Sequence, residues 1–308
     1  MAFLLTGQTD SGKSTIAGHL LYKIGYFDTL PEEDKKMYRS ALDKISTSTS
    51  KSKYSILMDI IDGEILTNKT KTQEFSICDF EYGIKFRLID TPGHQLYIRS
   101  LLEGLFHVQN LSILCLVISS IENEFTESFE KGTVKEDLLL GRSIGCKHLI
   151  VLWNKIDVHK PTDEMKTILY HFCKNLRFLT TDNIYLSGYT GENIMDILDC
   201  VKKYTKEVKC DEVKEISTSK LCLKCFFFTD EVKSILLSVG FQFVLHHKTG
   251  EYDAEIERIT DESKSITVIR DNKPVKIVLS LNRPITYSEG DKAIFRFQRY
   301  TIGCGVAQ

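Results

Sequence analysis

The stretch GQTDSGKST, residues 7–15 of a chain of 308 residues, decides the fold of what surrounds it. The apolar run AFLLT precedes it, and the run KSTIAGHLLYKIG that follows carries apolar residues at helical spacing and ends at Gly25. A strand, a turn of the pattern GxxxxGKS/T and a helix form a phosphate-binding loop. Glycines allow backbone N–H groups to converge on an anion at the positive end of the helix. We therefore expect this loop to bind a nucleoside triphosphate.

The residues of this loop have different expected tasks. Backbone N–H groups turn inward toward the phosphates, Lys13 is expected to reach the β- and γ-phosphates and to serve catalysis, and Ser14 is expected to ligate Mg²⁺. The predicted nucleotide contacts in the loop are Gly7, Ser11, Gly12, Lys13, Ser14 and Thr15. The loop alone does not say which base is bound.

The motif NKID at residues 154–157 follows a predicted apolar strand and favours guanine over adenine. The Asp157 carboxylate accepts two hydrogen bonds, and guanine offers two adjacent donors at N1 and N2, whereas adenine has an acceptor at N1. Asn154 is expected to tie this segment to the phosphate loop, and Lys155 is counted among the nucleotide contacts. An ATPase stays an alternative, which competition between ATP and guanine nucleotides would test.

A second base-side segment is LSGYTG at residues 186–191, which follows another predicted strand. Backbone N–H groups near Ser187 and Gly188 are expected to donate hydrogen bonds to guanine O6. The position of the segment after a strand, rather than its composition, supports this interpretation.

The motif DTPGH at residues 90–94 follows the predicted strand KFRLI. At a strand end the Asp90 carboxylate is expected to hold Mg²⁺ through water. The Gly93 N–H is expected to meet the γ-phosphate, whose loss would release the segment. The His94 imidazole, directly after it, is expected to position the attacking water.

Strand-like and helical runs alternate through residues 1–204. This alternation predicts an α/β P-loop GTPase domain with a mostly parallel sheet and helices on both faces. The run FSICDFEYGIKFRLID adds a hairpin that turns at Tyr82–Gly83. Residues 205–218 are charged and rich in Ser and Thr, which predicts a linker. Residues 219–308 carry six strand-like runs and no convincing helix, which predicts a small all-β barrel.

The composition indicates a globular protein with no overall attraction to polyanions, because the net charge is −2. No apolar run approaches the roughly 20 residues that span a bilayer. The nine cysteines follow no framework spacing and are interpreted as reduced thiols of a cytoplasmic protein. Cys222 and Cys225 are interpreted as part of a buried strand rather than a zinc or redox site. We expect neither membrane association nor sequence-specific nucleic-acid binding.

With these four segments in order, the chain resembles the translational GTPases. The likeness is greater to the branch that holds elongation factor one-alpha, the eukaryotic class-II release factor and the ribosome-rescue GTPase. DSGKST resembles that branch's DAGKST, DTPGH its DAPGH, and YLSGYTGENI its SG…G.N segment. KTQEF at residues 71–75 is similar to the KTVEV of the release-factor GTPase, which favours that member of the branch.

The resemblance implies roles that spacing does not. Asp10 matches the Asp of the family's phosphate loop, and His94 matches the catalytic His. Thr72 matches the switch Thr that ligates Mg²⁺ and senses the γ-phosphate, so it joins the catalytic and metal-binding sets. Thr70 is the alternative to Thr72, because the registration is loose there. The expected ligands are GTP, GDP and Mg²⁺.

The resemblance also implies partners and one departure from the family. The expected partners are the ribosome and a class-I release factor, bound through the carboxy-terminal barrel in translation termination. A second-domain barrel normally stands between the GTPase domain and the third domain, and only the short linker fills that place here. Ribosome rescue with a tRNA-shaped partner is the first alternative function. The second is a nucleotide-binding adaptor with weak hydrolysis, favoured by the altered first switch LTNKTKTQE at residues 66–74.

Overall fold

The computed structural model describes the chain in two compact units, one centred on residues 1–207 and the other on residues 208–308. The described residues are 1–308 apart from 31, 33–34, 37, 41–53, 62–75, 92–110, 177, 205–214, 228–234, 248–249, 262–263, 270–273 and 299. Each unit is described by itself.

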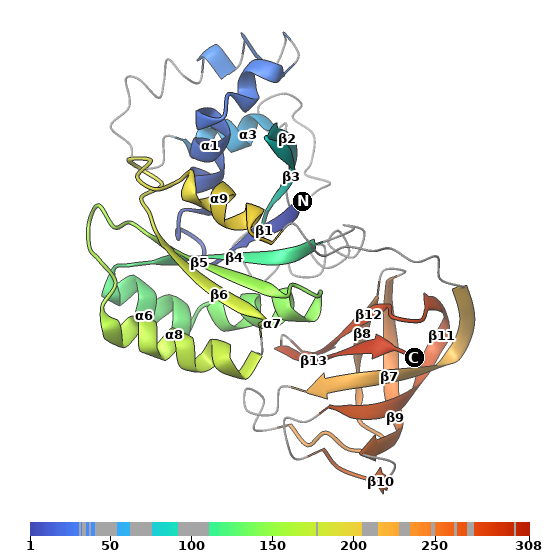
Figure 1. The fold of residues 1–308 in the computed structure, drawn as a ribbon. Coiled ribbons are helices and arrows are strands. Elements are labelled where there is room, and N and C mark those ends of the chain that lie inside the picture. The colour runs from blue at the N-terminus through green and yellow to red at the C-terminus, as the bar shows by residue number, and fades with distance from the viewer. Residues whose placement is uncertain are drawn as a thin grey trace. The chain divides into compact units, whose positions relative to one another are not determined.

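The first unit is built on a six-stranded sheet with the strand order β2-β3-β1-β4-β5-β6 (Figure 1). Its parallel strands are β1 (Ala2–Thr6), β3 (Ile84–Asp90), β4 (Leu111–Ser119), β5 (His148–Asn154) and β6 (Thr180–Tyr185). The edge strand β2 (Ser76–Tyr82) is antiparallel to β3 and pairs Tyr82 with Ile84 across the expected hairpin turn. The predicted mostly parallel sheet is therefore confirmed.

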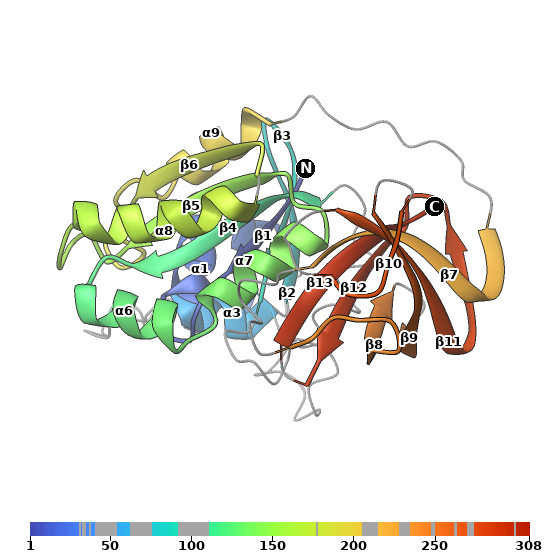
Figure 2. The same ribbon diagram turned by 90° about the horizontal axis from the view of Figure 1, so that it is seen from below.

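Helices cover both faces of this sheet, as the sequence predicts. Figures 1 and 2 show α1, α3 and α9 on one face and α6, α7 and α8 on the other. The helices are α1 (Lys13–Lys23), α3 (Ser55–Ile61), α6 (Glu122–Glu130), α7 (Val134–Ser143), α8 (Asp163–Leu176) and α9 (Asp196–Lys202), with the 3₁₀ helix η1 (Tyr26–Thr29) after α1.

The central strands β4 and β5 are buried on both faces, which explains their unbroken apolar sequences. Alternate side chains of a strand point to opposite faces of its sheet. Leu152 of β5 joins the core cluster that contains Leu20 of α1 and Leu198 of α9. The next residue, Trp153, stacks on Phe125 of α6, with the ring centroids 5.9 Å apart. The sheet therefore holds a layer of helices on each side.

The second unit is a closed barrel. Six antiparallel strands follow the order β9-β11-β7-β13-β12-β8, and the pairing of β8 with β9 closes the ring; the short strand β10 adds to β9. The strands are β7 (Glu215–Phe227), β8 (Gln242–His247), β9 (Gly250–Asp261), β10 (Lys264–Ile266), β11 (Val275–Ser288), β12 (Lys292–Phe297) and β13 (Tyr300–Ala307). This architecture confirms the predicted small all-β barrel.

The first strand of the barrel begins earlier than the sequence predicts, and it contains the pair of cysteines. Strand β7 begins at Glu215, inside the stretch 205–218 that we expected to be a linker, because β7 continues its pairing with β11 to Ser288. Cys222 and Cys225 both lie in β7, where Cys225 is buried and both thiols are free.

The described helices include none with the length and apolar composition of a membrane span.

Candidate nucleotide-binding site

The phosphate loop joins the end of β1 to the first turn of α1 and curls around Lys13. Gly7 and Gly12 have φ angles of 147° and 96°, and Asp10 has a φ of 62°. A Cβ atom at Gly12 would lie 2.3 Å from Asn154 Nδ2, so glycine is required for this close approach. The Lys13 ammonium donates to Gly7 O at 2.7 Å and to Gln8 O at 2.9 Å.

The loop has the chemistry of an anion site. Gly12 caps α1 and has no side chain that could accept a hydrogen bond from the first N–H groups of the helix, which is the arrangement of an anion-binding helix N-terminus. The buried Ser11 hydroxyl has no hydrogen-bond partner among the described residues and lies 3.2 Å from the position of a Gly7 Cβ. Burial lowers the pKa of Lys13, and the charge of Asp90 opposes this shift. The residues present therefore fit a bound phosphate group.

The Asn154 side chain joins three segments of the site. Its Nδ2 donates to Ser11 O in the phosphate loop at 2.8 Å, and its Oδ1 accepts from Gly188 N at 2.9 Å. Asn154 is 4% exposed, so both bonds are shielded from water. The end of β5, the phosphate loop and the loop after β6 are thus held together by one amide.

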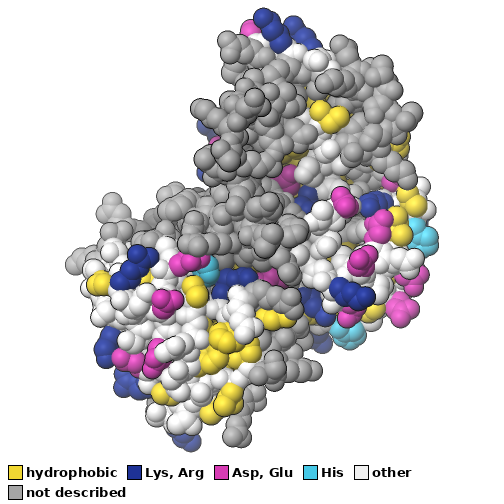
Figure 3. Space-filling model, turned by 180° about the vertical axis from the view of Figure 1, so that it is seen from behind, with side chains coloured by type: hydrophobic (Ala, Val, Ile, Leu, Met, Phe, Trp, Pro, Cys, Tyr) yellow, Lys and Arg dark blue, Asp and Glu magenta, His cyan; other side chains and the backbone are white. Residues whose placement is uncertain are grey.

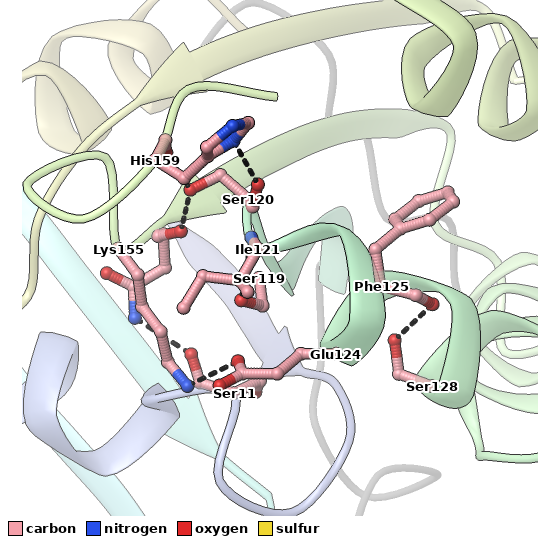
Figure 4. A network of polar contacts seen from close by, with 10 residues as sticks. Ser11, Ser119, Ser120, Ile121, Glu124, Phe125, Ser128, Lys155 and His159 are labelled. Carbon is pink, nitrogen blue, oxygen red and sulfur yellow. Dashed lines mark hydrogen bonds and ion pairs between the residues drawn. The ribbon is translucent and has the colours of Figure 1, made fainter. Parts of the chain in front are cut away.

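The NKID segment is also fastened to the end of β4 (Figure 4). The Ser120 hydroxyl, which has a single proton to donate, lies within hydrogen-bond distance of two carbonyl oxygens, Asn154 O at 2.7 Å and His159 O at 2.6 Å. Lys155, with a φ of 69°, places its ammonium 2.6 Å from Glu124 of α6, and Figure 4 shows this pair beside Ser11. Asp157 is exposed. The sequence did not indicate Ser120 or Glu124, because neither belongs to a motif.

The loop after β6 uses its backbone donors internally. Ser187 N donates to Glu192 O at 3.2 Å, and Gly188 N donates to Asn154 Oδ1. The N–H groups that we expected to meet guanine O6 therefore have protein partners here, because the loop folds into a tight turn. Leu186 N donates to Trp153 O at 2.9 Å, which places this loop directly beside the NKID segment.

Two of the predicted metal ligands, Ser14 and Asp90, lie among the residues that the structure describes. Ser14 is half-buried in the first turn of α1, and Asp90 is buried at the end of β3, opposite Leu5 of β1. Thr91 donates to Leu5 O from both its backbone N at 3.2 Å and its hydroxyl at 3.0 Å, which fixes this strand end. Thr70, Thr72, Gly93 and His94 lie outside the described residues.

A polar network behind the phosphate loop was not foreseen from the sequence. Gln8 Oε1 accepts from Thr133 N at 2.8 Å and from Thr133 Oγ1 at 3.1 Å, and Thr133 Oγ1 also lies 3.0 Å from Asp137 Oδ2. Burial raises the pKa of Asp137 to about 7, although the charge of Lys13 opposes the shift. The start of α7 is thereby attached to the loop, across a separation of 125 residues.

Comparison with known proteins identifies this arrangement. The family model of the elongation factor Tu GTP-binding domain matches residues 1–207. The chain belongs to this family. It is therefore a member of the translational GTPase family, and a barrel follows its GTP-binding domain.

Similar proteins fit this assignment. Elongation factor 1-alpha of Desulfurococcus mucosus is 31% identical over 208 residues, which are 63% of this chain and 44% of that protein. Elongation factor 1-alpha of Xenopus laevis is 31% identical over 201 residues, or 62% of this chain and 41% of that protein. The chain thus matches less than half the length of these relatives.

Among solved structures, the Ski7 GTPase-like domain of S. cerevisiae, bound to GDP and inorganic phosphate, has a TM-score of 0.75 and 12% identity. That match covers 100% of this chain and 97% of the other. At this identity the likeness shows that the two chains share a fold.

We predict that Asn154→Ala weakens GDP binding at least about tenfold. The exchange leaves two buried backbone groups, Ser11 O and Gly188 N, without their partner, and each such loss costs about 1 to 3 kcal/mol. Isothermal titration calorimetry with GDP measures the effect. Asn183→Ala is the matched control, because it removes a side-chain bond to Trp153 on the same sheet and leaves the loops alone. Equal affinities of the Asn154 variant and wild type would contradict the prediction.

We also predict that the first unit loses stability as the pH rises from about 4 to 7. The folded Asp137 keeps its proton up to about pH 7, whereas the unfolded carboxyl releases it near 3.8, so the folded state binds more protons between these values. The cost at neutral pH is at most about 4 kcal/mol. Urea unfolding across this pH range measures it. Asp137→Asn should flatten the profile, and a variant with the wild-type slope would refute this assignment.

Proposed function

We propose that this protein binds GTP and hydrolyses it to GDP and phosphate on the ribosome, acting with a class-I release-factor-like partner in translation termination. The observation that carries the nucleotide assignment is the Asn154 amide, which brings the phosphate loop, the NKID segment and the loop after β6 into one site. Family membership supports the translational role. The likeness of KTQEF at residues 71–75 to the release-factor switch supports termination.

The triphosphate is assigned to the backbone N–H groups of residues 7–15 and to Lys13. Guanine is assigned to Asp157, which would accept from N1–H and the N2 amino group, and to the loop that contains Ser187 and Gly188. An adenine at the same place would present an acceptor to the Asp157 carboxylate. The family's guanine nucleotide is therefore preferred over ATP.

Magnesium would be held by Ser14, Asp90 and Thr72, or by Thr70 in the other registration. When bound, it neutralises charge on the β- and γ-phosphates. Lys13 shares this task from within the loop. Gly93 would donate to the γ-phosphate, and His94 would orient the attacking water and accept its hydrogen bond.

The partner is assigned to the barrel on the strength of its surface. Leu236 and Val239 are 67% and 43% exposed, and the following Phe241 packs its half-buried ring 5.1 Å from that of Phe297. Figure 3 shows hydrophobic side chains gathered on the barrel in this view. Apolar surface of this kind favours a protein partner. A tRNA-shaped factor of ribosome rescue is the alternative partner.

A second candidate function is that of a nucleotide-binding adaptor with weak or no hydrolysis. Two observations favour it. The first is the altered first switch at residues 66–74, and the second is that only a short linker stands where the family has its second-domain barrel.

Hydrolysis is tested by His94→Ala. We expect ribosome-stimulated GTP turnover to fall about 100- to 1,000-fold, as for loss of a group that positions or activates the nucleophile, with GDP affinity unchanged. His171→Ala, at an exposed position of α8, is the matched control. Indistinguishable turnover in wild type and the His94 variant would remove the enzyme assignment and leave the adaptor.

The partner is tested by direct binding of purified factors to the protein loaded with a non-hydrolysable GTP analogue. We expect a class-I release factor to bind, and Leu236→Glu to weaken that binding at least about tenfold, because it places a charge in the apolar surface. Ile168→Glu on the exposed face of α8 is the control. Binding of the rescue factor alone would replace termination by rescue, and binding of neither would remove the partner proposal.

A further inference from the structure

One face of α1 holds the base-side loop at residues 186–191. Ile16, His19 and Lys23 lie three and four residues apart along the helix, so they share that face. A Cβ atom at Gly188 would lie 3.0 Å from Ile16 Cγ1. His19 Nδ1 is 2.8 Å from Gly188 O, and Lys23 Nζ donates to Gly191 O at 2.7 Å. Helix α1, which begins at the phosphate loop, is therefore also hydrogen-bonded to the loop at residues 186–191.

The His19 ring is held in one orientation. It is 3% exposed and stacks on Tyr54, with ring centroids 3.7 Å apart and an angle of 17° between the planes. A Cβ atom at Gly191 would lie 2.5 Å from His19 Cε1. A carbonyl oxygen only accepts hydrogen bonds, so Nδ1 carries the proton in the bond to Gly188 O. The tautomer and the ring position are both set by the surroundings.

The backbone around Gly188 is consequently fixed from two sides. Asn154 Oδ1 accepts from its N–H at 2.9 Å, and His19 donates to its carbonyl at 2.8 Å. Two successive peptide planes meet at this residue, and each has one buried side-chain bond. The path of the loop at residues 186–191 therefore depends on both bonds.

We propose that His19 is a positioning residue for guanine recognition, which holds the loop after β6 at the place where it borders position 6 of the base. The proposal rests on the proposed function, because it concerns the same nucleotide site. The same helix carries Lys13, six residues earlier, so it fixes the distance between the phosphate and base subsites. His19 itself touches neither the phosphates nor the base in this role.

The experiment compares GDP with 6-thioguanosine diphosphate, which differs from GDP only at position 6 and presents a weakly accepting sulfur there. Inosine diphosphate, which lacks only the N2 amino group, reports separately on Asp157. The variants are His19→Phe, which keeps a ring against Tyr54 but has no donor, and His19→Asn, whose amide supplies a donor close to the position of Nδ1. Affinities are measured by calorimetry.

For wild type we expect GDP to bind about tenfold more tightly than the 6-thio analogue, because the larger and weakly accepting sulfur meets a loop that is held in place. In His19→Phe this ratio should fall to about two or less, while the ratio of GDP to inosine diphosphate stays at the wild-type value. His19→Asn should recover part of the lost preference for GDP, so that the ratio returns at least halfway to the wild-type value on a logarithmic scale. A wild-type ratio in His19→Phe would overturn the proposal.

His148→Phe is the matched control. His148 is also buried, its Nδ1 bonds the Thr180 hydroxyl at 2.9 Å, and its ring stacks on Tyr204 at 4.1 Å, away from the loops of the site. This exchange should leave both ratios unchanged, and an equal loss of the O6 preference here would show a general loosening of the domain and overturn the assignment. If His19→Phe does not fold, Lys23→Met carries the test with a smaller decrease, about twofold to threefold.

Failure of the proposed function is distinguishable from failure of this inference. A wild-type protein that binds ADP as tightly as GDP refutes the guanine site before any variant is compared. A guanine-selective wild type whose His19 variants behave like the His148 control refutes the positioning role alone.

Discussion

The site depends on one planar amide. Asn154 is buried between two loops, and it meets one with a donor and the other with an acceptor, at 2.8 and 2.9 Å. A carboxylate of the same shape has no donor for Ser11 O, and a leucine would leave both backbone groups without partners. An unsatisfied buried polar group destabilises the fold by more free energy than one hydrogen bond stabilises it, so few side chains are tolerated at this position. The relative position of the phosphate and base subsites follows from this constraint.

The sheet makes that constraint possible. Parallel strands carry their carboxyl ends to the same edge, so β1, β3, β5 and β6 deliver the phosphate loop, Asp90, the NKID segment and the loop at 186–191 to one place. Helix α1 then adds a second connection between the first and last of these segments through His19. Two independent links, one from a strand end and one from a helix face, make the spacing between the subsites rigid.

The environment behind the phosphate loop sets its electrostatics. Lys13 is buried and bonded to two carbonyls of its own loop, and Asp137 shares the same enclosed region. Burial disfavours the charged form of each group, so the lysine pKa falls and the carboxyl pKa rises, while their mutual attraction limits both shifts. A phosphate group would add negative charge beside the lysine and favour its charged form. The network of Gln8, Thr133 and Asp137 therefore belongs to the site.

The sequence by itself determined the phosphate loop, the alternating strands and helices, the mostly parallel sheet with two helical layers and the barrel, because these follow from local spacing and periodicity. The tie between Asn154 and the phosphate loop was also foreseeable, since it belongs to a motif. Only the tertiary structure decided the pair of Lys155 with Glu124, the bond of His19 to Gly188 and the contacts of Gln8 with Thr133. These join residues 31, 169 and 125 positions apart, respectively, and neither partner's local sequence carries a signal of the other. The internal use of the Ser187 and Gly188 N–H groups likewise depends on the path of a folded turn, which composition does not encode.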